Sequence, residues 1–349
     1  MEPETPADWL RYGQAQEAGG TAESVAGAVQ SYRKAIELLG AHPAEQARRE
    51  LGITWMNFGN ARQKQSDPAA SEEAVRAYDD AIALLEGGNS SDAFALRNSV
   101  GAAWMNRGHA LQRRGDGDGI TAAIASYDRA IALLETLPPG ENPFFIINLA
   151  AAWLNRAQAL LSLPTPDADS AHVAAGKALQ LTVGNARTDP MAADIALKTY
   201  HALSAALSHR LSRKPEAPLV AETGDTIDDA LALVRHWETQ GVEGIRRFEI
   251  VFYRFGARFY LAHQPRFVTE FLLETLTHVS TPGVTADDGE LYSIATSTLA
   301  QARSDVYNRS LLNPNDEDLA RMRIELDEAN RRIATLFPSR LSPGGGTIA

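Results

Sequence analysis

Six polar side chains recur at two positions of a repeated motif, and their chemistry suits hydrogen bonding to a polypeptide. An asparagine returns twice at intervals of 49 residues, and another polar residue follows it three places later each time. The set comprises Asn57, Asn60, Asn106, His109, Asn155 and Gln158. Amide groups both donate and accept hydrogen bonds, so one amide per repeat would suit an extended main chain. The alternative is that these side chains make only local polar contacts, and the sequence leaves both interpretations open.

A second group of candidate binding residues lies in segment 246–260, which is rich in arginine and aromatic residues. On a helix, Arg247, Arg254 and Arg258 share one face, while four phenylalanines share another. In an acidic protein this arginine stripe would suit an acidic peptide, a phosphate or a small anionic ligand near Arg254. The alternative is an aromatic core whose arginines pair with acidic neighbours. We expect the aromatic residues in the core in both cases.

The sequence contains no motif for catalysis or metal binding. There is no cysteine, and the histidines lack the spacing of metal ligands. Phosphate loops, dinucleotide fingerprints and nucleophile elbows are also missing. The segment 115–119 resembles the start of a calcium loop, but it lacks the remaining acidic ligands, so we interpret it as a turn. We predict a protein without catalytic activity, cofactor or metal.

Charge and hydropathy narrow the class of partner. The net charge of −11 argues against nucleic acid and anionic membranes as partners. The N-terminal residues are acidic and carry no apolar run, so they are not expected to form a secretory signal. No stretch is expected to reach the roughly 18 apolar residues of a membrane helix. We therefore predict a cytoplasmic protein whose partner is a protein or peptide.

The polar residues belong to a repeat that is marked by tryptophan. Trp55, Trp104 and Trp153 follow one another at 49-residue intervals, and Trp9 precedes them by 46 residues. A Tyr-x-x-Ala-Ile motif begins 23 residues after Trp9, after Trp55 and after Trp104. Apolar residues around this motif step by three, four and three positions, which places them on one face of a helix. Each repeat is thus predicted to form two helices that bury their apolar faces against each other and against the next repeat.

These residues resemble the tetratricopeptide repeat. In that family a tryptophan is followed by Leu-Gly three and four residues later, and by an aromatic residue in the second helix; Trp55, Phe58, Gly59 and Tyr78 fill these places here. The resemblance is strong over residues 9–183 and weak beyond. The family period is about 34 residues, so the longer period here predicts lengthened first helices.

The resemblance implies an all-α fold, a right-handed solenoid of about seven antiparallel helix pairs whose first helices line a concave binding groove. It places the recurring asparagines in that groove. We predict clear repeats over 1–183, divergent repeats continuing the same solenoid over 184–337, with a last pair near 288–308 and 316–337, and a disordered tail over 338–349. The predicted function is a non-catalytic scaffold or adaptor. The alternatives are a self-associating structural protein, which would be a homo-oligomer, and a sensor with an anion pocket near Arg254.

Overall fold

The computed structural model describes residues 3–40, 45–67, 69–86, 93–242, 244–279 and 286–336. Helices and their connecting turns account for all of these residues, and no strand occurs among them. This confirms the predicted all-α class. The chain forms two compact units, residues 1–206 and 207–349. The predicted tail at 338–349 lies outside the described residues.

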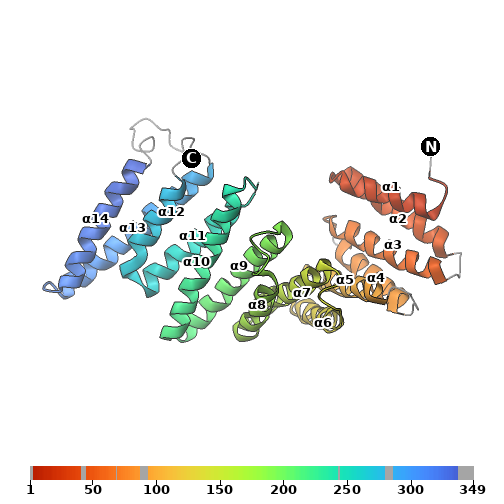
Figure 1. Ribbon diagram of the computed structural model, residues 1–349, viewed down its shortest axis with the longest axis horizontal. Coiled ribbons are helices and arrows are strands. Elements are labelled where there is room, and N and C mark those ends of the chain that lie inside the picture. The colour runs from red at the N-terminus through yellow and green to blue at the C-terminus, as the bar shows by residue number, and fades with distance from the viewer. Residues whose placement is uncertain are drawn as a thin grey trace. The chain divides into compact units, whose positions relative to one another are not determined.

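The N-terminal unit is a series of helices, of which α1 to α8 pack in chain order (Figure 1). They are α1 (Pro6–Ala18), α2 (Ala22–Gly40), α3 (Glu45–Gln63), α4 (Ala70–Glu86), α5 (Ala93–Gln112), α6 (Gly117–Leu134), α7 (Pro143–Leu161), α8 (Ala168–Thr182) and α9 (Pro190–Arg213), whose last residues belong to the C-terminal unit. Helices α3, α5 and α7 begin 10 or 11 residues before the tryptophan of their repeat. The lengthened first helices therefore hold part of the additional residues of the 49-residue period.

Helix starts follow from local sequence. The Asn142 side chain accepts a hydrogen bond from the Phe144 N–H at 3.0 Å, and Pro143 occupies the first helical position of α7. Asp116 caps α6 in the same way. Of the segment 115–119, only Gly115, with φ of +75°, forms the turn, and Gly117 already begins the helix. The interpretation of the whole segment as a turn was therefore wrong for residues 117–119.

Four odd-numbered helices of the N-terminal unit, α1, α3, α5 and α7, contact one another in succession. Besides packing on its neighbours in sequence, α3 contacts α1 and α5, and α5 contacts α7. Among the described residues, successive even-numbered helices make no comparable contact. Helices on the inner side of a curved stack are closer together than those on the outer side. We therefore assign α1, α3, α5 and α7 to the inner side of this unit.

A glycine and a tyrosine hold the two helices of each early pair close together. Tyr78 and Tyr127 are completely buried, and their rings lie against Gly59 and Gly108 of the preceding helix. A Cβ atom added to Gly108 would lie 2.6 Å from Cε1 of Tyr127, which is closer than van der Waals contact allows. The glycine of the repeat is therefore required by the ring beneath it.

The fourth pair replaces both members of this contact. Ala157 stands where the earlier repeats have glycine, and Ala175 stands where they have tyrosine. Both alanines are completely buried. In the fourth repeat a larger residue in α7 thus accompanies a smaller one in α8, and both positions stay buried without a Gly–Tyr contact.

Successive pairs are joined by an ion pair of constant geometry. Arg107 Nε lies 2.6 Å from Asp79 Oδ1 and joins α5 to α4, and Arg156 Nε lies 2.6 Å from Asp128 Oδ1 and joins α7 to α6. Each guanidinium also stands over the tryptophan ring three residues earlier, at 5.4 and 5.8 Å from the ring centroid. The same polar contact therefore recurs at both junctions.

The apolar composition of α7 contradicts the expectation that no stretch of the chain reaches the length and hydropathy of a membrane helix. Between Pro143 and Leu161 the helix is long and apolar enough to cross a membrane by length and composition. Arg156 is its only charged residue. Some of its apolar side chains, such as Phe145 and Leu154, are buried, whereas Phe144 is 53% exposed. Helix α7 packs on both α6 and α8, and this burial accounts for part of its apolar composition.

The C-terminal unit also consists of packed helices. They are α10 (Ala217–Thr239), α11 (Arg246–His263), the short 3₁₀ helix η1 (Pro265–Phe267), α12 (Val268–Val279), α13 (Ala286–Leu312) and α14 (Glu317–Leu336). Helix α11 contacts α12 and α13, and α14 contacts α12 and α13. The predicted last pair is thus present as α13 and α14. Fourteen α-helices in the described residues agree with about seven pairs.

Candidate functional site

The predicted polar row lies on three neighbouring helices of the inner face. Helix α3 carries Asn57 and Asn60, α5 carries Asn106 and His109, and α7 carries Asn155 and Gln158. His109 is exposed, and the five residues with amide side chains are half-buried. The row is therefore continuous along α3, α5 and α7, but its members differ in the hydrogen bonds that they make.

Two asparagines of the row are used to join helices. Asn106 Nδ2 donates to Asn60 Oδ1 at 3.1 Å, and the Tyr78 hydroxyl donates to the same oxygen at 2.7 Å. Gln63 Nε2 lies 2.6 Å from the Tyr78 hydroxyl and donates to the main-chain carbonyl of Asn106 at 3.1 Å. These bonds tie α3 to both α4 and α5. The interpretation as local polar contacts therefore describes Asn60 and Asn106.

His109 belongs to the same network. Its Nδ1 lies 2.6 Å from Gln63 Oε1. Since the amide nitrogen of Gln63 donates elsewhere, its oxygen accepts from His109, which places the imidazole proton on Nδ1. Although His109 as a whole is exposed, partial desolvation of its ring and then the positive charge of Arg113 lower its pKa. We therefore treat His109 as neutral, with its Nε2 as a hydrogen-bond acceptor.

Removing the Tyr78 hydroxyl should reveal how much the network stabilises the unit. Tyr78→Phe should lower the free energy of unfolding by about 1–2 kcal/mol, because Asn60 Oδ1 and Gln63 Nε2 both lose a partner. Tyr127→Phe is the matched control: its ring is equally buried, but its hydroxyl makes one bond, to Gln112 Oε1 at 3.1 Å. Urea unfolding followed by circular dichroism measures both losses. Equal losses for the two variants would contradict a stabilising network.

The members of the polar row on α7 are not engaged in side-chain hydrogen bonds within the described residues. Asn155 and Gln158 make no side-chain hydrogen bond to any described residue. The α5–α7 junction is bonded on either side of them: Asn148 Nδ2 donates to an asparagine of α5 at 2.9 Å, and Gln112 Nε2 donates to the hydroxyl of Ser162 at 3.4 Å. Two adjacent amides in the middle of the junction therefore keep unused donors and acceptors on the inner face.

Asn57 is the third amide with unused capacity. Its Nδ2 is buried and has no hydrogen-bond acceptor among the described residues. Buried polar groups are normally paired, so rotation of this amide toward a ligand would gain a bond and lose none. The structure thus divides the predicted row into three residues engaged within the protein and three whose side chains have bonds to offer.

One functional position of the repeat was missed by sequence reasoning. The residue four places after the repeat glycine bonds the buried tyrosine hydroxyl in each early pair: Glu17 to Tyr32 at 2.8 Å, and Gln63 and Gln112 as described above. In the fourth repeat this position is Leu161, and the tyrosine is absent as well. The fourth repeat loses the polar residue and the tyrosine together, and this joint loss in the sequence could have identified the two positions as hydrogen-bond partners.

The arginine stripe of α11 is partly engaged. Arg254 forms an ion pair with Glu290 of α13, and Arg247 stands over the Phe248 ring at 4.9 Å. Arg258 is exposed and makes no polar contact with a described residue. Phe252 on the other face is completely buried. Arg254 and the aromatic residues thus have the arrangement of the core interpretation, and only Arg258 offers an unused guanidinium.

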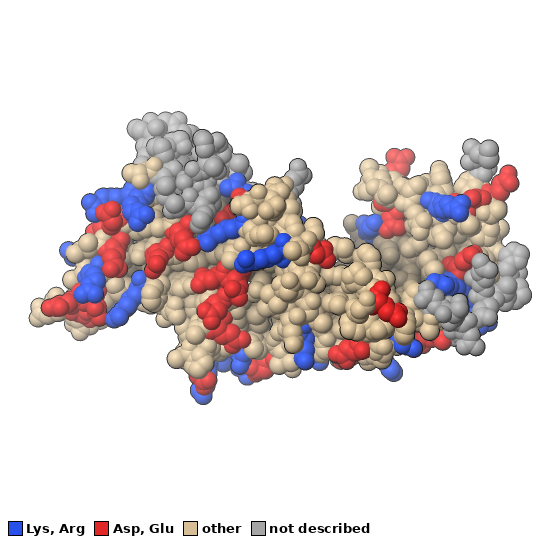
Figure 2. Space-filling view, in the orientation of Figure 1, with Lys and Arg blue, Asp and Glu red and all other residues tan. Residues whose placement is uncertain are grey.

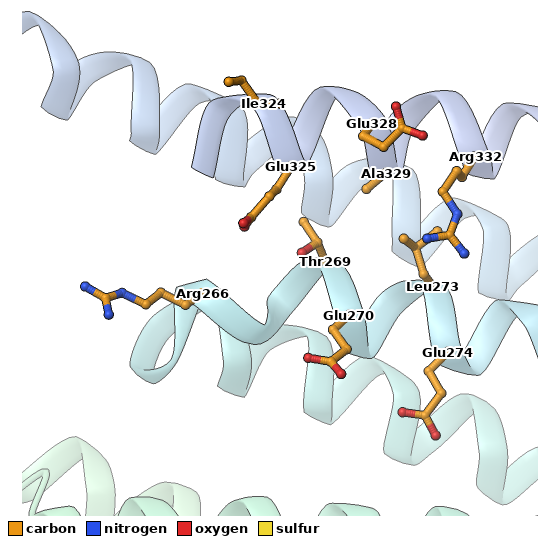
Figure 3. A pocket seen from close by; sticks show the side chains of 10 residues that line it. All are labelled: Arg266, Thr269, Glu270, Leu273, Glu274, Ile324, Glu325, Glu328, Ala329 and Arg332. Atoms are coloured by element: carbon orange, nitrogen blue, oxygen red, sulfur yellow. The ribbon is translucent and has the colours of Figure 1, made fainter. Parts of the chain in front are cut away.

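A groove lies elsewhere in the C-terminal unit, between α12 and α14 (Figure 3). Its volume is about 770 Å³, and no residue of α11 lines it. Glu270 and Glu274 of α12 and Glu325 and Glu328 of α14 border the groove, and Leu273 lies between the two helices. Four carboxylates against two arginines make this groove unsuited to an anionic ligand. It is not the anion pocket that the arginine stripe suggested.

Neither the charge distribution on the molecular surface nor the comparison with known proteins points to another functional site. On the face shown in Figure 2, basic side chains are scattered among acidic ones and form no continuous basic patch. No family model matches the chain, and no curated protein matches it in sequence. Function is therefore argued from the geometry of the inner face.

Proposed function

We propose that the protein is a non-catalytic scaffold of the tetratricopeptide-repeat type, a right-handed superhelical array that binds an extended peptide segment of a protein partner. The ligand lies across α3, α5 and α7 on the inner face of the N-terminal unit. The observation that carries this proposal is the pair of half-buried amides, Asn155 and Gln158, without internal partners. Asn57 extends the same surface to α3.

Helix spacing matches the repeat of an extended chain. Packed helices stand about 8–10 Å apart, and three residues of an extended peptide span about 10 Å. A peptide crossing the helices would therefore present a main-chain N–H or C=O to each inner helix at every third residue. Amides bind either group, so this surface would hold the main chain and leave recognition of side chains to the residues around it.

Peptide selection with the purified protein tests the proposal. Random peptides displayed on phage are selected on the immobilised protein, and the affinity of a selected peptide is measured by fluorescence anisotropy. Asn155→Ala with Gln158→Ala should weaken binding about 10- to 30-fold, as expected for two lost hydrogen bonds, and should leave the melting temperature unchanged. Failure to select any peptide, or unchanged affinity in this variant, would contradict the proposal.

The engaged members of the row provide the contrasting variant. Asn60→Ala with Asn106→Ala should lower the melting temperature, because it removes the bonds between α3, α4 and α5. Gln30→Ala is the control for an exposed amide on α2, an even-numbered helix. It should change neither stability nor affinity. A binding loss confined to Asn155 and Gln158 would separate recognition from structure.

A further inference from the structure

Helix α14 has two opposite faces with different character. One face, marked by Leu319, Leu326 and Ile333, is buried against the rest of the C-terminal unit. Among the described residues of the C-terminal unit, only α12 and α13 make extended contact with α14. The opposite face advances by four, three, four and three residues, so its members lie in line along the helix. They are Glu317, Arg321, Ile324, Glu328 and Arg331, and all five are exposed. Ile324 and Glu328 also border the groove between α12 and α14, and Glu328 forms an ion pair with Arg331 at 2.8 Å within the helix.

The centre of this outer face is apolar. Ile324 is 66% exposed, and in Figure 3 it points away from α12, whereas Glu325 points toward it. The ion pair between Arg303 and Asp327, at 3.0 Å, fixes the register of α13 against α14. Since the two helices run antiparallel, exposed Leu311 of α13, two turns beyond Arg303, lies beside the first half of α14. The exposed end of the unit thus carries apolar surface where a terminal repeat is usually polar.

The charges on either side of Ile324 are arranged so that the outer face of one copy would be complementary to the reversed outer face of a second copy. Along the outer face the order is negative, positive, apolar, negative, positive. When a second copy is laid antiparallel about Ile324, Glu317 faces Arg331 of the other copy, and Arg321 faces Glu328. The two-fold axis generates each pair twice, so four ion pairs surround an Ile324–Ile324 contact. Such a surface matches itself, as an isologous interface requires.

We propose that the outer face of α14 is a homodimer interface in which two copies pair antiparallel about Ile324. The partner is a second copy of this chain, because the alternating charges fit their own reverse. One helix face is smaller than the standard protein interface, so the dimer dissociates readily. Its ion pairs are exposed, which makes association weaker at high salt. The inference is independent of the peptide-binding surface.

Charge reversal on the full-length protein provides the test, with association measured by sedimentation velocity over a concentration series. The wild type should dimerise reversibly. Arg321→Glu should weaken association at least tenfold, because it faces Glu328 with a like charge on both sides of the axis. Arg323→Glu is the matched control: it makes the same charge change on the same helix, one position away from Ile324 and off the outer face. It should associate like the wild type.

A fourfold exchange makes the test specific for the antiparallel pairing. Glu317→Arg, Arg321→Glu, Glu328→Arg and Arg331→Glu together preserve every pair within a helix and between like copies. This variant should dimerise with itself but not with the wild type, as seen by native mass spectrometry of a mixture. Circular dichroism confirms that each variant is folded. A monomeric wild type, undiminished association of Arg321→Glu, or free mixing of the fourfold variant with the wild type would overturn the proposal.

Discussion

Helix content should fall steeply as the pH rises from about 10 to 11, because five buried tyrosines resist ionisation in the folded protein. They are Tyr32, Tyr78, Tyr127, Tyr253 and Tyr260. Burial raises the pKa of each hydroxyl above its usual value, with added contributions from nearby carboxylates such as Glu17 beside Tyr32. The unfolded chain loses these protons near pH 10, whereas the folded chain keeps them.

The direction and size follow from proton linkage. Above the unfolded pKa of about 10, the unfolded state binds fewer protons than the native state, so the free energy of unfolding decreases as pH rises. The stability is fully present below pH 10 and is lost toward the raised pKa values of the folded state. Each tyrosine contributes a slope of about 1.4 kcal/mol per pH unit. The three in residues 1–206 together approach about 4 kcal/mol per pH unit.

The measurement follows tyrosinate absorbance and circular dichroism in one alkaline titration. The absorbance of the buried tyrosines should rise in the same pH interval in which helicity falls. Tyr127→Phe should reduce the slope of the unfolding free energy of the N-terminal unit against pH, because one proton fewer is released on unfolding. Full ionisation of the tyrosines with helicity unchanged would contradict the expectation.

Gly108→Ala should lower the free energy of unfolding by about 1–3 kcal/mol, the usual cost of overpacking. The added methyl group would lie 2.6 Å from the buried ring of Tyr127, and the ring has no free space to move into. The loss exceeds the gain of up to about 1 kcal/mol that alanine otherwise brings to a helix. Urea unfolding provides the measurement.

Gly176→Ala in α8 is the matched control. The glycine is also inside a helix, but a Cβ atom there would meet nothing within 4 Å. This variant should gain about 0.5–1 kcal/mol, since only the helical preference changes. Loss of stability in the control, or a gain in Gly108→Ala, would show that the Gly–Tyr contact does not determine the residue type.

The helix pairs were predictable because their signal is local and periodic. Gly108, Tyr127 and the apolar residues around them recur at fixed intervals, and each interval corresponds to one helix face. The apolar helix α7 was misjudged because overall composition was weighed without considering a helix that is buried on two sides.

The division of the polar row was not predictable from its spacing. Asn60 and Asn106 are not equivalent positions of the repeat, yet their side chains bond each other across 46 residues at the α3–α5 junction. At the α5–α7 junction the bonded side chains are 50 residues apart. The axial match of neighbouring helices is a tertiary property that differs between the two junctions, so spacing alone could not show which amides of the row are engaged.

The constant junction between pairs has a consequence for how such a chain changes length. Arg107 with Asp79 and Arg156 with Asp128 make the same contact at successive junctions. A tandem duplication of the 49-residue segment that carries α5 and α6 would therefore create a junction whose polar partners already match. Unequal recombination within such a gene would extend the inner surface by one helix without requiring a new interface to evolve.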